Sequence, residues 1–423
     1  MISLYYERTI KNTILSISNT YPVLLVTGPR QVGKTTLLTR LADESRKIVT
    51  LDNPTVRALA KTDPALFLQR YAPPVLIDEV QYAPELFDYI KIYVDEHKRC
   101  GDFWLTGSQT FHVMKSVTES LAGRVGIAHM LGLSNSEITR HHFSPFITNP
   151  EELMERMKTT DPMTLTQIFD RIYKGSMPRL YERDDVDRDN YYESYLETYI
   201  SRDIRDLTQV ADELSFLKFI NIVAARTATN VNYETLASET GISAPTAKQW
   251  LSILVSSGLV TLIEAYSNNA LKRVIKSPRM YFLDTGLCAY LTRWNSAEAL
   301  ERGAMDGQFF ESWVVSEIYK SYLNNGKRPP LYFYRDSNKK EIDVIIHQNN
   351  TVYPIEIKKG SYPKDAIKNF SVLKPITQEP SEEDVFAGTA HLKTAIGIGA
   401  VVCLASDIMP IDKKNWYVPA WLI

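Results

Sequence analysis

The stretch YPVLLVTGPRQVGKTTLLTRLA, residues 21–42, decides the fold of the first part of this chain. Its apolar run at residues 23–27 predicts a buried strand of a parallel sheet. The run leads into the motif GPRQVGKT, residues 28–35, and a helical pattern begins at Thr36. A strand, a glycine-rich loop of this spacing and a helix, in this order, predict a phosphate-binding loop.

The residue types in this loop suit a nucleoside triphosphate and a magnesium ion. Glycines let backbone N–H groups surround phosphates, and the N-terminus of the following helix adds a partial positive charge. The Lys34 ammonium would neutralise the outer phosphate oxygens, and the Thr35 hydroxyl would reach Mg²⁺. The alternative is a glycine turn in front of a purely structural helix. We therefore expect ATP and Mg²⁺ as cofactors, with the binding residues Gly28, Pro29, Arg30, Gln31, Val32, Gly33, Lys34, Thr35 and Thr36.

Three later segments extend the expected sheet, because residues 47–52, 73–80 and 102–108 each predict a strand. The segment 73–80 carries Asp78 and Glu79 near its end. Asp78 would orient the magnesium shell, and Glu79 would polarise the attacking water that hydrolysis needs. The alternative is that both acids only cap the following turn.

Two further residues are candidates for contact with the γ-phosphate. Ligands of such sheets lie beyond the carboxyl ends of the strands, where Ser108 is found, so Ser108 either senses the γ-phosphate or belongs to a simple polar turn. Arg124 directly precedes a fifth expected strand. It would stabilise transition-state charge in a neighbouring subunit, which requires a homo-oligomer, or it has a structural role. The sequence leaves both pairs of alternatives open.

Several segments resemble a large family of prokaryotic AAA+-type ATPases that have a C-terminal region of poorly known function. They are VLLVTGPRQVGKTTL, VLIDEVQYAPELFDYIK, FWLTGSQ and LAGRV, followed by GSMPRLYE, YLETYISRDIRDL and YFLDTGLCAYL. The resemblance covers nearly the whole chain and implies an ATP-hydrolysing P-loop core with a five-stranded parallel sheet over residues 1–140. One departure is GSMP at residues 175–178, where the family more often has two glycines before an aromatic residue and a proline. We expect a shifted turn there.

Composition sets the broad class of the protein. The 423 residues suffice for two to four domains, and 23% charged with 44% hydrophobic residues is ordinary for a soluble globular protein. The net charge of -2 argues against a globally basic nucleic-acid coat. Three cysteines far apart in sequence form neither a disulfide framework nor a zinc pattern. Because there is no signal-peptide pattern or long apolar run, we expect a soluble cytoplasmic protein without a membrane partner.

Residues 141–230 predict a helical lid over the nucleotide site. Helical patterns alternate there with polar breaks, and tyrosines recur at helical spacing. These tyrosines fit the core face of a helix better than a base-stacking platform, because no basic residues lie between them. They are Tyr191, Tyr192, Tyr195 and Tyr199.

Residues 231–300 predict a winged helix-turn-helix. Gly241 supplies the tight turn between its two helices, and Ser243 can cap the second helix. That helix would bury Trp250, Leu251 and Leu254, and it would present Thr246, Lys248 and Gln249 to a DNA major groove.

A basic wing follows these helices, because no acid lies between Asn268 and Asp284. Such a cluster of cations favours contact with phosphate, so DNA is the expected partner. The alternatives are an interdomain or protein-binding module and a solvated basic hairpin. The cations of the wing are Lys272, Arg273, Lys276 and Arg279.

Residues 301–423 predict an α/β domain. Within it, KKEIDVIIHQNNTVYPIEIKKG, residues 339–360, predicts two strands around an Asn-Asn turn. With a two-residue turn, Asp343 faces Glu356 and Glu341 faces Lys358, all on one side of the sheet. Opposed acids destabilise a sheet unless a cation neutralises them, and a divalent metal ion would do so.

This hairpin resembles the Asp…Glu-x-Lys signature of the PD-(D/E)xK restriction-endonuclease-like fold. The resemblance implies a Mg²⁺-dependent phosphodiesterase site with Asp343, Glu356 and Lys358, and with Glu311 on the preceding helix as a further acid. Three points oppose it. The bare pattern occurs easily by chance, Pro354 suits an edge strand better than a central strand, and nearby lysines could neutralise the acids without a metal. Those lysines are Lys339, Lys340 and Lys359.

The whole chain is therefore expected to be a multidomain α/β protein. Its expected function is that of a DNA-associated AAA+-type ATPase that couples nucleotide state to a C-terminal nuclease-like module. The alternative is a nucleotide-gated regulatory switch or DNA-binding scaffold whose nuclease-like domain is inactive. RNA is a third possible ligand.

Overall fold

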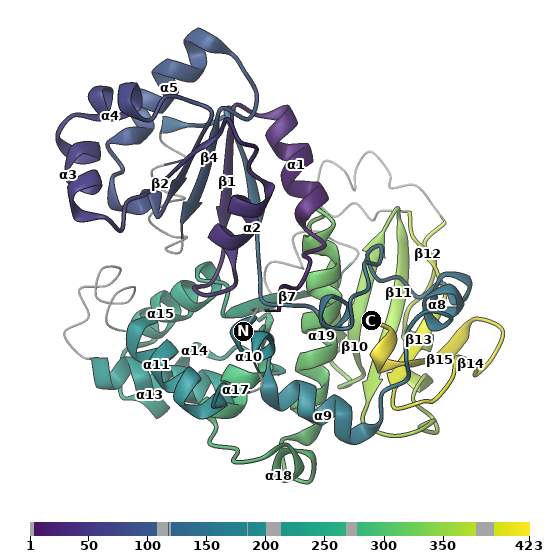
Figure 1. Cartoon of the computed structure of the whole chain (residues 1–423). Helices are drawn as coiled ribbons and strands as arrows, with labels where there is room; N and C mark the ends of the chain where they lie inside the picture. The colour runs from purple at the N-terminus through teal and green to yellow at the C-terminus, as the bar shows by residue number, and fades with distance from the viewer. Residues whose placement is uncertain are drawn as a thin grey trace, which may run out of the picture.

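The structure, a computed structural model, describes residues 4–107, 117, 120–183, 185–199, 213–267, 277–377 and 393–423 (Figure 1). These residues form an N-terminal lobe, coloured purple and blue, and a larger second lobe built from the rest of the chain. Among the described residues, no helix combines the length and apolar character needed to cross a bilayer.

The N-terminal lobe is built on a five-stranded parallel sheet, as the sequence predicts, and its strand order is β2-β3-β4-β1-β5. Alternate residues of β1 enter different cores: Leu24 and Val26 pack with α1 and α2, and Val23 and Leu25 pack with α3, α4 and α5. A sheet covered on both faces needs such apolar strands. The strands are β1 Val23–Thr27, β2 Lys47–Thr50, β3 Val75–Asp78, β4 Phe103–Gly107 and β5 Val125–His129, and the helices are α1 Lys11–Thr20, α2 Lys34–Leu41, α3 Pro54–Thr62, α4 Pro64–Arg70, η1 Val80–Tyr82 and α5 Leu86–His97.

The helices after β5 pack differently from the expected lid. Helix α8 (Pro150–Met157) packs against η4 (Ala420–Leu422) at the end of the chain, and α9 (Leu165–Lys174) packs against α17 (Thr285–Leu291), α18 (Ala297–Glu301) and α19 (Asp306–Asn324). The prediction of a lid over the nucleotide site is therefore wrong for α8 and α9. Their apolar side chains are buried against the C-terminal half of the protein instead.

Three of the four tyrosines of α11 (Arg188–Tyr199) belong to the core, as expected, and the side chain of Tyr199 lies outside the described part of the structure. Tyr191, Tyr192 and Tyr195 are buried, and Tyr192 donates a hydrogen bond to Asp284 Oδ1 at 2.8 Å. The remaining helices of this part are α7 Asn135–Ile138, α10 Arg179–Glu182 and α13 Glu213–Ala225.

A helix pair follows where the sequence predicts a helix-turn-helix. Helix α14 (Tyr233–Thr240) ends at Gly241, which has a φ of 90°, and the Ser243 side chain caps α15 (Ala244–Ser256) by accepting from Thr246 N. The side chains of Trp250, Leu251 and Leu254 are buried, and those of Lys248 and Gln249 are exposed. Strands β6 (Thr229–Asn230), β7 (Val260–Ala265) and β8 (Arg279–Phe282) pack beside this pair.

The sheet continues across the expected domain boundary near residue 300. Strand β7 pairs in parallel with β9, which joins β6 and β8 to the C-terminal strands in one ten-stranded sheet. The helix α19 packs against both β8 and β11, so the two expected domains share one core. The C-terminal elements are β9 Leu331–Arg335, β10 Glu341–Gln348, β11 Thr351–Lys358, η3 Lys368–Val372, β12 Ala395–Ile396, β13 Gly399–Cys403, β14 Met409–Pro410 and β15 Asn415–Pro419.

Strand β11 is central in this sheet, contrary to the expectation for a strand that contains Pro354. It pairs with β10 on one side and with β12 and then β13 on the other side. Pro354 lies between the residues that pair with β12 and those that pair with β13. The missing N–H group therefore falls at an interruption of the ladder, where a proline is tolerated.

Candidate nucleotide site and acid cluster

The glycine-rich loop has the backbone that a phosphate-binding loop needs. Gly28, Gln31 and Gly33 have φ values of 142°, 60° and 93°. A Cβ atom on Gly28 would lie 1.9 Å from the carbonyl oxygen of Met130, so only glycine fits there. Helix α2 begins at Lys34, directly after the loop, and its N-terminus faces the site.

The expected magnesium ligands lie in contact with each other. Thr35 Oγ1 donates a hydrogen bond to Asp78 Oδ1 at 2.6 Å, and the hydroxyl of Thr106 also donates to this carboxylate. The Lys34 side chain is buried, and its Nζ lies 2.9 Å from the Gly28 oxygen and 2.7 Å from the Pro29 oxygen. Loop, lysine, hydroxyl and carboxylate are thus brought together, as a nucleotide with Mg²⁺ requires.

Glu79 stands beside this group at the carboxyl end of β3. It has a left-handed backbone with a φ of 57°, and its N–H donates to Thr106 Oγ1 at 3.1 Å. Its carboxylate also accepts a hydrogen bond from the side chain of Gln81. Ser108, the expected sensor of the γ-phosphate, lies outside the described residues.

Arg124 is not brought to the nucleotide site of its own chain. It precedes β5 and therefore lies at the amino edge of the parallel sheet, opposite the loop that follows β1. Its Nε and Nη2 atoms donate to the two oxygens of Asp95 on α5, at 2.6 Å and 2.9 Å. These hydrogen bonds raise the pKa of Arg124 and lower that of Asp95.

Arg8 also contacts the glycine-rich loop, and nothing in the sequence pattern predicts this contact. Its guanidinium donates to the carbonyl oxygens of Val32 at 2.8 Å and of Leu131 at 2.6 Å, and it lies 3.3 Å from Glu137. The side chain is 4% exposed. No motif includes Arg8, because its partners follow it by 24 residues or more.

The C-terminal hairpin has the register that a two-residue Asn-Asn turn predicts. The pairs run from Gln348 with Thr351 to Val344 with Ile355. Beyond them, the Asp343 carboxylate accepts a hydrogen bond from the N–H of Ile357 at 2.9 Å. Asp343 and Glu356 are 8% and 7% exposed, so the hairpin does bring both acids into one buried site.

The lysine of the expected signature lies beside these acids. Lys358 Nζ is 2.7 Å from Glu356 Oε1 and 3.5 Å from Asp343 Oδ2. Lys359 instead forms an ion pair with Asp306 at 2.6 Å. Burial first, and then the charge of Asp343, raise the pKa of Glu356 to about 7.

Arg279 occupies a place that differs from the predicted one. It was expected on the exposed basic wing, but it is 5% exposed and lies among the acids. Its Nη1 is 3.1 Å from Glu311 Oε1 and 3.8 Å from Asp343 Oδ1, and its other terminal nitrogen contacts Glu341. The correction has a simple cause, because Arg279 begins the buried strand β8. The other wing residues, Lys272, Arg273 and Lys276, lie outside the described residues.

Glu311 is the fourth acid of this group, which we call the acid cluster: Glu311, Glu341, Asp343 and Glu356. Tyr281 donates a hydrogen bond to Glu311 Oε1 at 2.7 Å. Burial and the charge of Asp343 raise the pKa of Glu311 to about 7. Burial lowers the pKa of Arg279, but the neighbouring Tyr281 and Glu311 outweigh this effect, so the pKa of Arg279 is raised.

The acid cluster fits a metal ion poorly in this conformation. Within the described ranges, no group of three or more His, Cys, Asp or Glu side chains is arranged to hold a metal ion. Arg279 and Lys358 supply positive charge in its place. One feature remains unexplained by these ion pairs: Glu356 Oε2 is buried and has no hydrogen-bond partner among the residues that the structure describes.

Comparison with known proteins divides the chain into three matched parts. A family model described as an AAA domain matches residues 20–139. Two models described as domains of unknown function (DUF8612 and DUF4143) match residues 165–298 and 306–423. The uncharacterized proteins Rv2008c of Mycobacterium tuberculosis and Mb2031c of Mycobacterium bovis are each 28% identical over 346 residues, which is 81% of this chain and 71% of theirs.

Solved structures resemble the chain only distantly. The Walker-type ATPase paby2304 of Pyrococcus abyssi is 14% identical with a TM-score of 0.42, and the match covers 68% of this chain and 96% of that one. The branch-migration motor RuvB of Thermotoga maritima is 16% identical with a TM-score of 0.29, covering 60% and 88%. At these TM-scores the likenesses carry no argument about function. The match of residues 20–139 to the AAA family model and the geometry of the glycine-rich loop do support a function. Together they identify the N-terminal lobe as an AAA domain of the P-loop ATPase type.

Proposed function

We propose that this chain is an AAA+-type ATPase that acts on DNA and couples its nucleotide state to the C-terminal acid cluster. The observation that carries the ATPase part is the 2.6 Å hydrogen bond between Thr35 Oγ1 and Asp78 Oδ1, next to Lys34. Thr35 and Asp78 would hold Mg²⁺, which would neutralise charge on the β- and γ-phosphates.

The chain's own residues supply the other parts of hydrolysis. The Lys34 ammonium donates hydrogen bonds to the carbonyl oxygens of Gly28 and Pro29 in the loop. When ATP binds, it would donate to phosphate oxygens in the same loop instead. The Glu79 carboxylate would orient the attacking water in line with the γ-phosphate. Ser108 is proposed as a sensor of that phosphate.

A direct contact supports coupling between the nucleotide site and the second lobe. Gly258, in the turn between α15 and β7, lies so near the loop that a Cβ atom on it would be 3.1 Å from Pro29 Cδ. Strand β7 pairs with β8, which carries Arg279 into the acid cluster. A change in the conformation of the loop on ATP binding would therefore shift β7 and β8, and with them the position of Arg279.

The α14–α15 pair with β7 and β8 is proposed as a winged helix that contacts DNA. The exposed Lys248 and Gln249 of α15 support this, as does the basic segment that precedes β8. The acid cluster would then be a PD-(D/E)xK-like phosphodiesterase site with Asp343, Glu356 and Lys358. The position of Arg279 favours the second candidate, a nucleotide-gated DNA-binding switch whose nuclease-like module does not cut.

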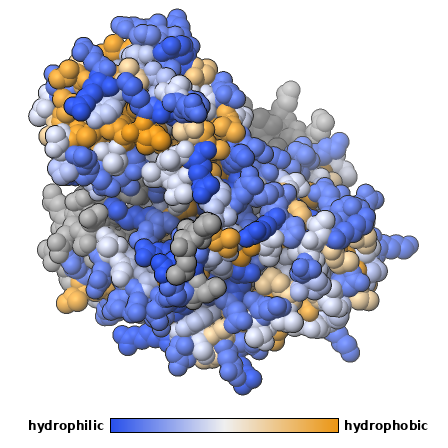
Figure 2. Space-filling view, in the orientation of Figure 1, coloured by the Kyte–Doolittle hydropathy of each residue, from blue (hydrophilic) through white to orange (hydrophobic). Residues whose placement is uncertain are grey.

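A homo-oligomer is part of the proposal. Figure 2 shows hydrophobic side chains gathered over the N-terminal lobe, where large apolar residues are exposed. Such surfaces often bind another protein chain. Arg124, at the amino edge of the sheet, could then reach a neighbour's nucleotide. The exposed residues are Ile48, Leu66, Tyr89 and Ile92.

The ATPase part is tested by phosphate release from the purified chain with ATP and Mg²⁺. Lys34→Ala and Glu79→Gln should each abolish turnover, and Lys61→Ala, on the exposed face of α3, should not change it. If both site variants hydrolyse ATP like the parent, the proposed mechanism is wrong.

The nuclease part is tested by incubating the chain with single-stranded and duplex DNA, ATP, and Mg²⁺ or Mn²⁺. Cleavage that Asp343→Ala removes would support the phosphodiesterase site. The absence of cleavage on every substrate, together with DNA binding that ATP alters, would support the switch instead.

A further inference from the structure

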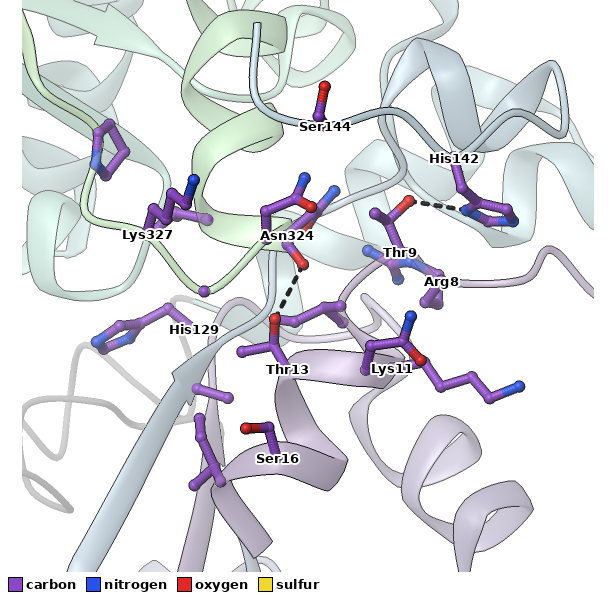
Figure 3. A pocket seen from close by; sticks show the side chains of 18 of the residues that line it. Arg8, Thr9, Lys11, Thr13, Ser16, His129, His142, Ser144, Asn324 and Lys327 are labelled. Carbon is purple, nitrogen blue, oxygen red and sulfur yellow. Dashed lines mark hydrogen bonds between the residues drawn. The ribbon is translucent and has the colours of Figure 1, made fainter. Parts of the chain in front are cut away.

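A cleft of about 1280 Å³ lies between the two lobes, separate from the loop and from the acid cluster. One wall is α1 with the end of β5, and the other is the C-terminal end of α19 with the loop toward β9; residues 142–144 also line it (Figure 3). At the floor, Thr13 Oγ1 donates to the backbone oxygen of Asn324 at 3.3 Å, which joins the two lobes.

The charges that line this cleft are mostly positive. Among the lining residues, Arg8, Lys11, Lys327 and Arg328 are basic and only Glu7 is acidic. Glu7 already contacts Lys11 at 3.1 Å, and the buried Arg8 lies 3.3 Å from Glu137, so the charges of Lys11 and Arg8 are offset. Lys327 and Arg328 are exposed and belong to none of the ion pairs found among the described residues. The cleft should therefore attract anions from solution.

Groups suited to phosphate oxygens lie between these cations. Helix α1 begins in the cleft wall at Lys11, has no side-chain cap at Ile10 and has no acid in its first turn. The Lys11 N–H donates to the Arg8 carbonyl oxygen at 3.1 Å, so within the described part of the chain the N–H groups of Asn12 and Thr13 and the partial positive charge of the helix are left for an anion. Hydroxyl groups of the same walls add hydrogen-bond donors, namely those of Ser16 and Ser144.

The cleft also offers surfaces for groups other than phosphate. The half-buried rings of Phe143 and Tyr319 line it from different segments. Asn324, 3% exposed, lies at its floor, and its Oδ1 has no hydrogen-bond partner within the described part of the chain. Aromatic rings, an unused acceptor and cations together suit bases and phosphates better than phosphate alone.

We propose that this cleft binds a single strand of nucleic acid, with phosphates at Lys327, Arg328 and the N-terminus of α1. The volume exceeds the roughly 300–1,000 Å³ of pockets for small ligands, which favours several linked nucleotides over one. This inference rests on the proposed function to the extent that the chain acts on nucleic acid. It adds a contact for a single strand at the cleft to the contact that is proposed for α15.

The cleft is connected to the nucleotide site through short paths. Arg8, three residues before α1, donates to the Val32 oxygen of the loop at 2.8 Å. His129 in the cleft wall is 2.9 Å from Thr27 Oγ1, and Thr27 directly precedes Gly28. ATP in the loop should therefore change the affinity of the cleft for a strand.

The test measures fluorescence anisotropy of a labelled oligothymidine of about 16 nucleotides, with the full chain at several salt concentrations. A Lys327→Ala/Arg328→Ala variant should bind about tenfold more weakly, and its salt slope should fall by about 1.4 because two phosphate contacts are lost. A matched Lys413→Ala/Lys414→Ala variant, exposed and outside the cleft, should bind like the parent.

Five outcomes would overturn the inference. Equal binding by the cleft variant and the parent would do so, as would an equal loss in the matched control. Competition by a mononucleotide as strong as by the oligomer would indicate a small-ligand pocket. If Lys248→Ala on α15 removes binding and the cleft variant does not, the inference fails but the proposed DNA association stands. Binding of no oligonucleotide by the parent would overturn both.

Discussion

Replacing Arg279 by methionine removes the central cation of the acid cluster while keeping an unbranched stem. The Arg279 side chain is 6% exposed, and its guanidinium lies 3.1 Å from Glu311, which is 17% exposed, and 3.8 Å from Asp343, which is 11% exposed. The change leaves these carboxylates buried near each other without their counter-charge. Breaking a buried pair by removing one partner costs about 3–5 kcal/mol, so Arg279→Met should lower the free energy of unfolding by about that amount.

The assay is urea unfolding followed by tryptophan fluorescence, with Arg302→Met as the matched control. Arg302 pairs with Glu298 at 3.0 Å, but both side chains are at least 70% exposed. A surface pair contributes about 0–1 kcal/mol, so the control should change little. The double variant Arg279→Met/Glu311→Gln should recover part of the loss, because the uncompensated charge of Glu311 is gone. If Arg279→Met costs no more than the control, Arg279 does not neutralise the cluster.

Gly28→Ala should remove binding of a fluorescent ATP analogue, because the new Cβ would lie 1.9 Å from the Met130 carbonyl oxygen. Gly307→Ala is the control and should bind normally, because its Cβ would meet no described neighbour within 4 Å. Asp284→Asn should lower the melting temperature, because its carboxylate accepts from Ser176 N, Ser176 Oγ, Tyr192 and Leu287 N and an amide cannot accept all four; an unchanged melting temperature would contradict this. The pKa of Glu311 is raised from 4.5 to about 7, so its stabilising contribution is present below 4.5 and is lost as the pH rises through 7. The melting temperature of Glu311→Gln should therefore fall less than that of the parent between pH 4.5 and 7. Parallel plots of melting temperature against pH for the two proteins would show that the pKa of Glu311 is not raised.

The local features of the fold follow from short stretches of sequence. The five strands of the N-terminal sheet were predictable because each is a brief apolar run before a polar edge, and the loop glycines follow from a fixed spacing. The register of the hairpin that brings Asp343 and Glu356 into one buried site was predictable, because an Asn-Asn turn fixes how two strands pair.

The wrong predictions concern burial between distant segments. A cationic run shows charge but not which of its members enters a strand, so Arg279 was expected on the surface although it pairs with acids 32 and more residues away. Helices α8 and α9 show amphipathic patterns, which indicate that a face is buried but not what covers it. Pro354 was unexpected in a central strand because a gap between two neighbouring strands has no sequence signal.

The bonds of Arg8 have a mechanical consequence for the whole molecule. The chain passes between the lobes before α1 and again after β5, and Arg8 on the first passage binds the carbonyl oxygens of Leu131 and Gly132 on the second. The two passages are therefore pinned at one pivot instead of acting as two independent tethers. A displacement of the first passage should therefore be transmitted through Arg8 to the second passage at Leu131 and Gly132.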